Sequence, residues 1–237
     1  MIPYLELPPF HLGPVRIYPF GAAVACALVT WLTLILRRAS PAGLDPRRAL
    51  RLFESILIAG FGGAVLFGLL WNRRLSYSSF GGAFGALAGA AIYLYTRRIP
   101  ARERWRYLDL LAYAFPFGWA FLRLGCSLVH DHPGRLTASS LAVEYPGGAR
   151  YDLGLLEMLL SAVVASIFLV LGRRKRPPGF FIRWLIVCGP IRVSLDLLRE
   201  NPPRFFGLTA DQIGGLVLTA AGAWLWIRTR ALGVSNP

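Results

Sequence analysis

The residues most able to do chemistry lie close together in one segment of the chain. RLGCSLVHDHPGR, at 123–135, brings an arginine, a cysteine, two histidines and an aspartate within ten positions, directly after an apolar run. Because imidazole titrates near neutral pH, His130 or His132 could accept a proton from a thiol. The alternative is that both are interfacial loop residues, bonded to Asp131 or to lipid headgroups. We expect no metal site from these three residues, since neighbouring positions on a short turn rarely converge on one ion without a further ligand.

A second group of charged residues lies inside apolar sequence. GPIRVSLDLLREN places Arg192, Asp196 and Arg199 at i, i+4 and i+7, on one face of a helix. Arg123 and a carboxylate, Glu157, also lie in apolar stretches, where ionisable groups are costly and usually face a bundle interior or a wet cavity. Because a guanidinium binds a phosphodiester through two parallel hydrogen bonds, Arg123 and Arg192 predict a site for an anionic group. A structural ion pair between Arg192 and Asp196 is the alternative.

The elements that must position these residues are predicted to be membrane-spanning helices. Of the 237 residues, 55% are apolar and only 16% are charged, against about 25% charged in soluble domains, and the mean hydropathy is +0.51. The three cysteines have no paired spacing, which argues against a disulfide framework. Seven apolar stretches are long enough to cross a bilayer, at about 17–36, 52–71, 79–96, 108–128, 152–172, 180–198 and 211–228.

The distribution of basic residues predicts the orientation of these spans. The connections after the first, third and fifth stretches, with the C-terminal tail, hold 17 of the 26 Lys and Arg residues, the opposite side holds 7, and the remaining two are Arg123 and Arg192. Because basic loops stay in the cytoplasm, we expect an all-α integral membrane protein with about seven transmembrane helices, the N-terminus outside and the C-terminus cytoplasmic. Residues 1–237 are expected to form a single transmembrane domain with an outward-facing loop at about 129–150. Basic residues spread in this way do not form a nucleic-acid-binding surface.

Six short segments resemble one known family when they are taken in order. They are VRIYPFG (15–21), SSFGGAFGALAG (78–89), RLGCSLVHDHPG (123–134), YDLGLLE (151–157), RVSLDLLRE (192–200) and GLTADQIGGL (207–216). Each segment is weak alone, but their order and spacing resemble the prolipoprotein diacylglyceryl transferase family over nearly the whole chain.

The resemblance implies a multi-pass enzyme of the bacterial inner (cytoplasmic) membrane. Such an enzyme moves the diacylglyceryl group of phosphatidylglycerol, or another anionic phospholipid, to the lipobox cysteine thiol of an exported prolipoprotein. A thioether forms and glycerol phosphate leaves, and no cofactor or metal is implied. The residues that the resemblance and the chemistry together assign to catalysis are Tyr18, Arg123, His130, Asp131, His132 and Arg192. Those assigned to substrate binding are Gly81, Gly82, Cys126, Gly134, Glu157, Asp196, Arg199 and Gln212.

The chain also departs from the family pattern at polar positions. Phe80 stands where the family has a histidine, and it cannot accept a proton. Cys126 stands for an asparagine, Asp131 and Asp196 stand for glutamates, and the His and Gln of a further motif become Tyr151 and Gly154. Two alternatives therefore stay open: a related phospholipid-dependent transferase with a different acceptor, and a lipid-binding membrane protein without catalysis.

Overall fold

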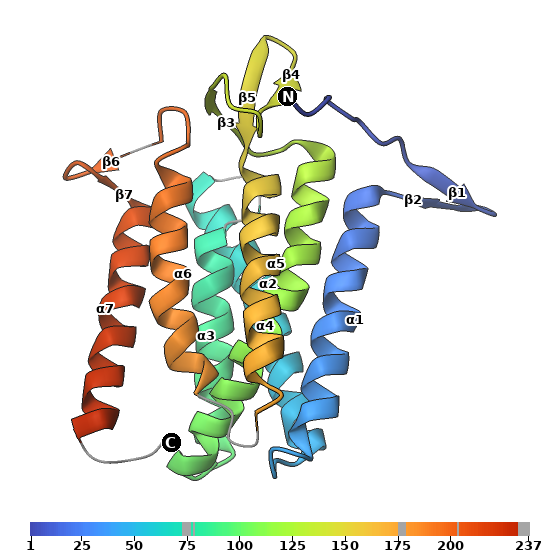
Figure 1. Cartoon of the computed structure of the whole chain (residues 1–237). Coiled ribbons are helices and arrows are strands. Elements are labelled where there is room, and N and C mark those ends of the chain that lie inside the picture. The colour runs from blue at the N-terminus through green and yellow to red at the C-terminus, as the bar shows by residue number, and fades with distance from the viewer. Residues whose placement is uncertain (73–76, 78, 175–178, 203, 232–237) are drawn as a thin grey trace. The chain divides into compact units, whose positions relative to one another are not determined.

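The computed structural model describes residues 1–72, 77, 79–174, 179–202 and 204–231 (Figure 1). Most of these residues are helical, and one helix corresponds to each predicted span. The helices are α1 Pro19–Ala39, α2 Pro46–Asn72, α3 Ser79–Thr96, α4 Ala101–Val129, α5 Leu153–Leu171, α6 Phe180–Asp196 and α7 Ala210–Ala231. Four of them are long and apolar enough to cross a membrane, by a search of the described residues: α1, α2 over Pro46–Leu70, α4 and α5.

The remaining helices are shorter or carry more polar residues. α6 has only 17 residues, and α7 has Asp211 in its first turn and Arg228 and Arg230 in its last. A membrane protein with several apolar helices is thus confirmed, while seven crossings and an outer N-terminus stay predictions. On α5, exposed Val163, Ile167 and Val170 share one helix face, which is the surface that a lipid-facing helix presents.

Three small antiparallel sheets accompany the helices, and the sequence prediction of an all-α chain missed them. β1 (Phe10–Leu12) pairs with β2 (Val15–Ile17), and β6 (Arg204–Phe205) pairs with β7 (Leu208–Thr209). The third sheet has the order β3-β5-β4, from Pro133–Leu136, Gly148–Asp152 and Val143–Tyr145. The predicted outward loop at about 129–150 is therefore a folded sheet, because backbone groups outside a helix must still find hydrogen-bond partners.

The chain divides into two compact units, whose boundaries fall within α1 and α4. One contains Leu32–Leu110 and the other contains Met1–Trp31 with Leu111–Pro237. In the first, α2 and α3 pack through glycines: a Cβ on Gly81 would collide with the Gly63 carbonyl and Phe67, and one on Gly82 would meet Ala64 Cβ at 3.6 Å. Gly81 is thus required for close helix packing; its predicted role in substrate binding, and that of Gly82, stay predictions.

In the second unit, the sheet β3-β5-β4 lies at the ends of α4 and α5 (Figure 1) and is hydrogen-bonded to the segment that follows α6. Arg135 N donates to Leu198 O beyond the end of α6 at 2.8 Å, and Leu153 N at the start of α5 donates to His132 O at 3.1 Å. Asp152 caps α5, since its Oδ1 accepts from Leu155 N at 2.9 Å. Such a side-chain acceptor satisfies a helix amide that has no intrahelical partner. These bonds fix the position of His132, which follows α4.

Gly134 is required where β3 passes the end of α6. A Cβ at this position would lie 2.7 Å from Leu198 O and 3.1 Å from Tyr151 Cβ. We expect Gly134→Ala to push β3 away from Leu198 and to cost about 1–3 kcal/mol, as overpacking does, measured as a lower thermal unfolding midpoint in detergent. Gly21→Ala is the control, because a Cβ there meets nothing within 4 Å. An unchanged midpoint for Gly134→Ala would contradict the close approach.

Candidate functional site

A buried carboxylate on α5 joins two arginines from the neighbouring helices. Glu157 Oε2 lies 2.9 Å from Arg123 Nε on α4, and Oε1 lies 3.1 Å from Arg192 Nη1 on α6. Trp119 Nε1 also donates to Oε1, at 2.8 Å. The Glu157 side chain is only 9% exposed, so these ion pairs and the Trp119 hydrogen bond replace the water that a carboxylate would otherwise require. The two intramembrane arginines predicted from the sequence therefore meet at one acid.

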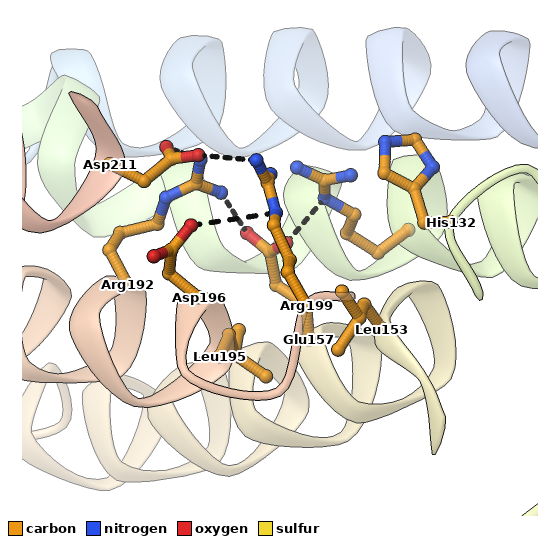
Figure 2. A pocket seen from close by; sticks show the side chains of 9 residues that line it. His132, Leu153, Glu157, Arg192, Leu195, Asp196, Arg199 and Asp211 are labelled. Atoms are coloured by element: carbon orange, nitrogen blue, oxygen red, sulfur yellow. Dashed lines mark hydrogen bonds and ion pairs between the residues drawn. The ribbon is translucent and has the colours of Figure 1, made fainter. Parts of the chain in front are cut away.

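Asp211 on α7 extends this network to a third arginine. Its Oδ1 lies 2.5 Å from Arg192 Nη2, and its Oδ2 lies 2.8 Å from Arg199 Nη1 (Figure 2). Asp211 was not predicted as a site residue, although it lies beside Gln212 in a segment that carries the family resemblance. The feature that could have identified Asp211 is an acidic residue in the first turn of an apolar helix.

Asp196 makes different contacts from those expected at i, i+4 spacing. Its Oδ2 accepts from Thr209 Oγ1 at 2.6 Å and from Gln212 Nε2 at 2.9 Å, while Oδ1 lies 3.7 Å from Arg199 Nε. Arg192 is instead paired with Glu157 and Asp211. Asp196 and Gln212 are both buried, so they hold the start of α7 against α6.

Three arginines and three acids thus form one network with no formal net charge. It borders a cavity of about 20 Å³, which is room for roughly one water molecule. The residues around this cavity are Arg123, His132, Leu153, Glu157, Arg192, Leu195, Asp196, Arg199 and Asp211 (Figure 2). An anion entering here would exchange part of its hydration for guanidinium groups, and would compete with the acids that now pair with them.

The two histidines of the HDH segment have different surroundings. His130 Nδ1 lies 2.8 Å from Asp152 Oδ2, and its side chain is 7% exposed. The ring of Tyr4 stacks on it, with centroids 4.1 Å apart, and Nε2 lies 3.3 Å from Leu5 O. Both ring nitrogens of His130 therefore lie beside oxygen atoms, one of Asp152 and one of Leu5. Within the described part of the chain, His132 lines the cavity and His130 does not.

The acid beside His130 also has a tyrosine partner. Tyr145 OH donates to Asp152 Oδ2 at 2.9 Å. Burial, together with the negative charge of Asp152, raises the pKa of Tyr145 well above its usual value, because both disfavour the phenolate. Tyr145 therefore stays a hydrogen-bond donor at physiological pH, and hydrogen bonds and ring contacts join Tyr4, His130, Tyr145 and Asp152 in one cluster.

We expect His130→Ala to release the N-terminal segment from the sheet. That segment is held by Ile2 N donating to Ala142 O at 2.8 Å and by Glu144 N donating to Ile2 O at 3.0 Å. Loss of the stacked imidazole should make local opening of this segment easier. A loss of about 1.4 kcal/mol in the free energy of opening would raise amide deuterium exchange at Ile2 and Glu144 tenfold. His132→Ala is the matched control and should leave this exchange unchanged. Equal exchange in both variants would refute the role given to His130.

Cys126, Asp131 and His132 come together beside the cavity. His132 Nδ1 forms an ion pair with Asp131 Oδ1, and the ligand atoms of all three residues lie within 4.8 Å of one another. Cys126 is buried in the last turn of α4, where Arg123 Nη1 lies 3.8 Å from its sulfur. The loop residues 130–132 alone predict no metal site, but in the structure Cys126, and not His130, lies with Asp131 and His132.

The remaining predicted site residues lie elsewhere. Tyr18 is exposed just before α1, with Arg16 Cζ 5.3 Å from its ring centroid, and it does not line the described cavity. Gly134 lies in β3, and Gly81 and Gly82 lie in α3 of the other unit. Phe80 is in the first turn of α3, and its side chain is outside the described residues. The structure therefore brings together Arg123, Glu157, Arg192, Asp196, Arg199 and His132, with Asp211 added.

Comparison with known proteins agrees with the resemblance drawn from the six motifs. The family model for prolipoprotein diacylglyceryl transferase matches residues 9–228. A phosphatidylglycerol–prolipoprotein diacylglyceryl transferase from Rhizobium meliloti (strain 1021) is 27% identical to this chain, with 98% of the chain and 95% of the relative aligned. The enzyme of the same name from Chromohalobacter salexigens is 26% identical, over 100% of the chain and 97% of its own length. The matched region contains every residue of the arginine network, and the chain belongs to the prolipoprotein diacylglyceryl transferase family.

Proposed function

We propose that this chain transfers the diacylglyceryl group of phosphatidylglycerol to the cysteine thiol of an exported prolipoprotein. The observation that carries the proposal is the meeting of three arginines around one small cavity: Arg123 on α4, Arg192 on α6 and Arg199 just beyond the end of α6. The names of the relatives support the donor and the acceptor. We place the protein in the bacterial inner membrane with about seven crossings, the N-terminus outside and the cavity toward the outer face.

The arginines suit the leaving group of this reaction. As the carbon–oxygen bond to phosphate breaks, negative charge grows on the departing glycerol phosphate, and fixed cations in a site of low polarity stabilise that charge. A guanidinium has five N–H donors, and the ion pairs use Nε of Arg123 and both terminal nitrogens of Arg192. A phosphate oxygen could therefore add to these pairs or displace the acids, and Glu157 and Asp211 hold the arginines in place beforehand.

The thiol of the acceptor must lose its proton before its sulfur can attack carbon. The family histidine is replaced by Phe80, so another group has to promote this step. Asp131 and His132 are the candidates, because His132 lines the same cavity as Arg123 and is paired with Asp131. His130 is a weaker candidate, since its ring is engaged by Asp152, Leu5 and Tyr4.

The test is turnover by the purified full-length protein in vesicles that contain phosphatidylglycerol. With a lipobox peptide, we expect glycerol phosphate release matched by a peptide mass increase of one diacylglyceryl group. A peptide with serine in place of the cysteine, and vesicles of phosphatidylcholine alone, are the controls. The absence of glycerol phosphate release with phosphatidylglycerol would refute the proposal and leave a lipid-binding protein.

A transferase with a different acceptor is the second candidate. It is favoured by Phe80, which stands where the family has a histidine, since the acceptor pocket and its base would then differ. It predicts glycerol phosphate release in native membranes without any modification of the peptide. Mass spectrometry of lipids from cells with and without the protein would then identify the product.

A further inference from the structure

Two of the positions at which this chain departs from its family lie beside one another in space. Cys126, in place of a family asparagine, and Asp131, in place of a glutamate, come together with His132. Their ligand atoms lie within 4.8 Å of one another, although they come from the last turn of α4 and from the loop that follows it. A thiolate, a carboxylate and an imidazole are the three ligand types that zinc takes in proteins, and a set of three leaves the fourth position open.

The spacing of the three ligand atoms and the exposure of two of the side chains suit an ion of this size. Zinc bonds of about 2.0–2.3 Å in a tetrahedral site separate the ligand atoms by about 3.5 Å. The more distant atoms would therefore approach by about 1 Å, and the paired atoms of Asp131 and His132 would separate to admit the ion. The side chains of Asp131 and His132 are 41% and 36% exposed and can make this shift, while Cys126 is held in the helix. One thiolate and one carboxylate would balance the two charges of the ion, and Arg123 Nη1 lies 3.8 Å from the thiol sulfur as an outer partner.

We propose that Cys126, Asp131 and His132 bind a zinc ion whose open position takes the acceptor thiol. This inference rests on the proposed transfer to a cysteine thiol. The reaction needs a thiolate, Phe80 cannot accept a proton, and a thiol that coordinates zinc is deprotonated outright. His132 and Arg123 line one cavity, so the ion would hold the sulfur close to the arginines that bind the phosphate.

The step balances without any oxidant or reductant. The acceptor S–H gives its proton to water as the sulfur coordinates zinc. The sulfur electron pair then forms the C–S bond to the terminal glyceryl carbon of the lipid, and the C–O bond to phosphate breaks. Its electron pair leaves with glycerol phosphate, whose added negative charge is taken up beside the arginines. Zinc keeps its charge throughout and exchanges the thioether for the next thiol.

Cobalt(II) substitution tests the metal site without any use of turnover. The purified full-length protein in detergent is stripped with a chelator and titrated with Co²⁺, and zinc affinity is then measured by competition. We expect one equivalent to bind with a thiolate-to-cobalt absorption band in the near ultraviolet. Cys126→Ser should abolish the band, and Asp131→Asn and His132→Ala should each weaken binding by about 10–100-fold. Cys26→Ser and His11→Ala, at exposed positions outside the site, should change neither quantity.

Binding of the acceptor thiol at the open position of the metal is measured separately. Adding the lipobox peptide to the cobalt-loaded protein should strengthen the thiolate band, and the peptide with serine should not. A band that survives Cys126→Ser, or no binding above that of this variant, overturns the metal site even when glycerol phosphate release is normal. If cobalt binds as expected but the cysteine peptide leaves the absorption band unchanged, the acceptor thiol does not coordinate the metal. Metal binding and a peptide response without glycerol phosphate release would instead refute the proposed function alone.

Discussion

Arg123→Ala is expected to lower the rate of glycerol phosphate release by about 100- to 1,000-fold, which is the usual loss when one group that stabilises developing charge is removed. Arg123 lies on α4 within the cavity wall, with its Nε in an ion pair with Glu157 Oε2 at 2.9 Å and its guanidinium 4.8 Å from the Trp119 ring centroid. These contacts hold the group in one orientation. Removing it leaves Arg192 and Arg199 to stabilise the leaving phosphate.

One further variant separates the charge of Arg123 from its geometry, and a second is a control. Arg123→Lys keeps the positive charge but loses the planar pair of donors, so its rate should fall between those of the wild type and the alanine variant. Arg135→Ala is the control, because it removes an exposed arginine of β3 that does not line the described cavity. A thermal unfolding midpoint is measured for each variant. Equal loss of activity in Arg135→Ala, or none in folded Arg123→Ala, would contradict a phosphate role for Arg123.

Glu157→Ala is expected to be the most destabilising single change in the arginine network. Glu157 is the only acid that contacts both Arg123 and Arg192 among the described residues. Without it, two guanidinium groups in apolar helices lose their shared partner, and breaking such a buried pair costs about 3–5 kcal/mol. At about 2–4 °C per kcal/mol for a chain of this size, the unfolding midpoint should fall by roughly 6–20 °C.

A conservative variant distinguishes the charge of Glu157 from its shape. Glu157→Gln keeps an oxygen that can accept from Trp119 Nε1 and Arg192 Nη1, so it should lose less stability than Glu157→Ala. Added anionic phospholipid should restore part of the loss in both variants if its phosphate binds the released arginines, because a ligand of the folded state raises stability. Phosphatidylcholine is the comparison lipid. An unfolding midpoint of Glu157→Ala within a degree of the wild type would contradict the central role of this acid.

The sequence predicted the local structure well because that structure follows from short-range patterns. Apolar runs of about 20 residues predicted one helix at each of seven places, and α1, α2, α4 and α5 are apolar enough to cross a membrane. Arg123 and Arg192 were predicted to be functional because a charged side chain in an apolar run costs free energy and usually has a functional role. The same reasoning missed the sheet β3-β5-β4, whose strands of three to five residues carry no clear alternation of apolar and polar residues.

Only the tertiary structure decided which charged groups meet. Spacing along α6 favoured Arg192 with Asp196, yet long side chains reach neighbouring helices, and Arg192 pairs instead with Glu157 and Asp211. From their positions in the sequence, His130 and His132 were equally good candidates for a proton acceptor. Backbone direction after α4 places His130 against Asp152 and His132 beside Cys126.

The sequence by itself therefore determined the helices, the family and the residues able to do chemistry, since each depends on residue type and near neighbours. The pairing of those residues depends on contacts between segments far apart in the chain, such as α5 with α7 through Arg192. Such contacts are decided by helix packing and by the sheet that anchors the loop after α4, and no local pattern encodes them. For that reason the arginine network and the convergence of Cys126 with Asp131 and His132 emerged only from the fold.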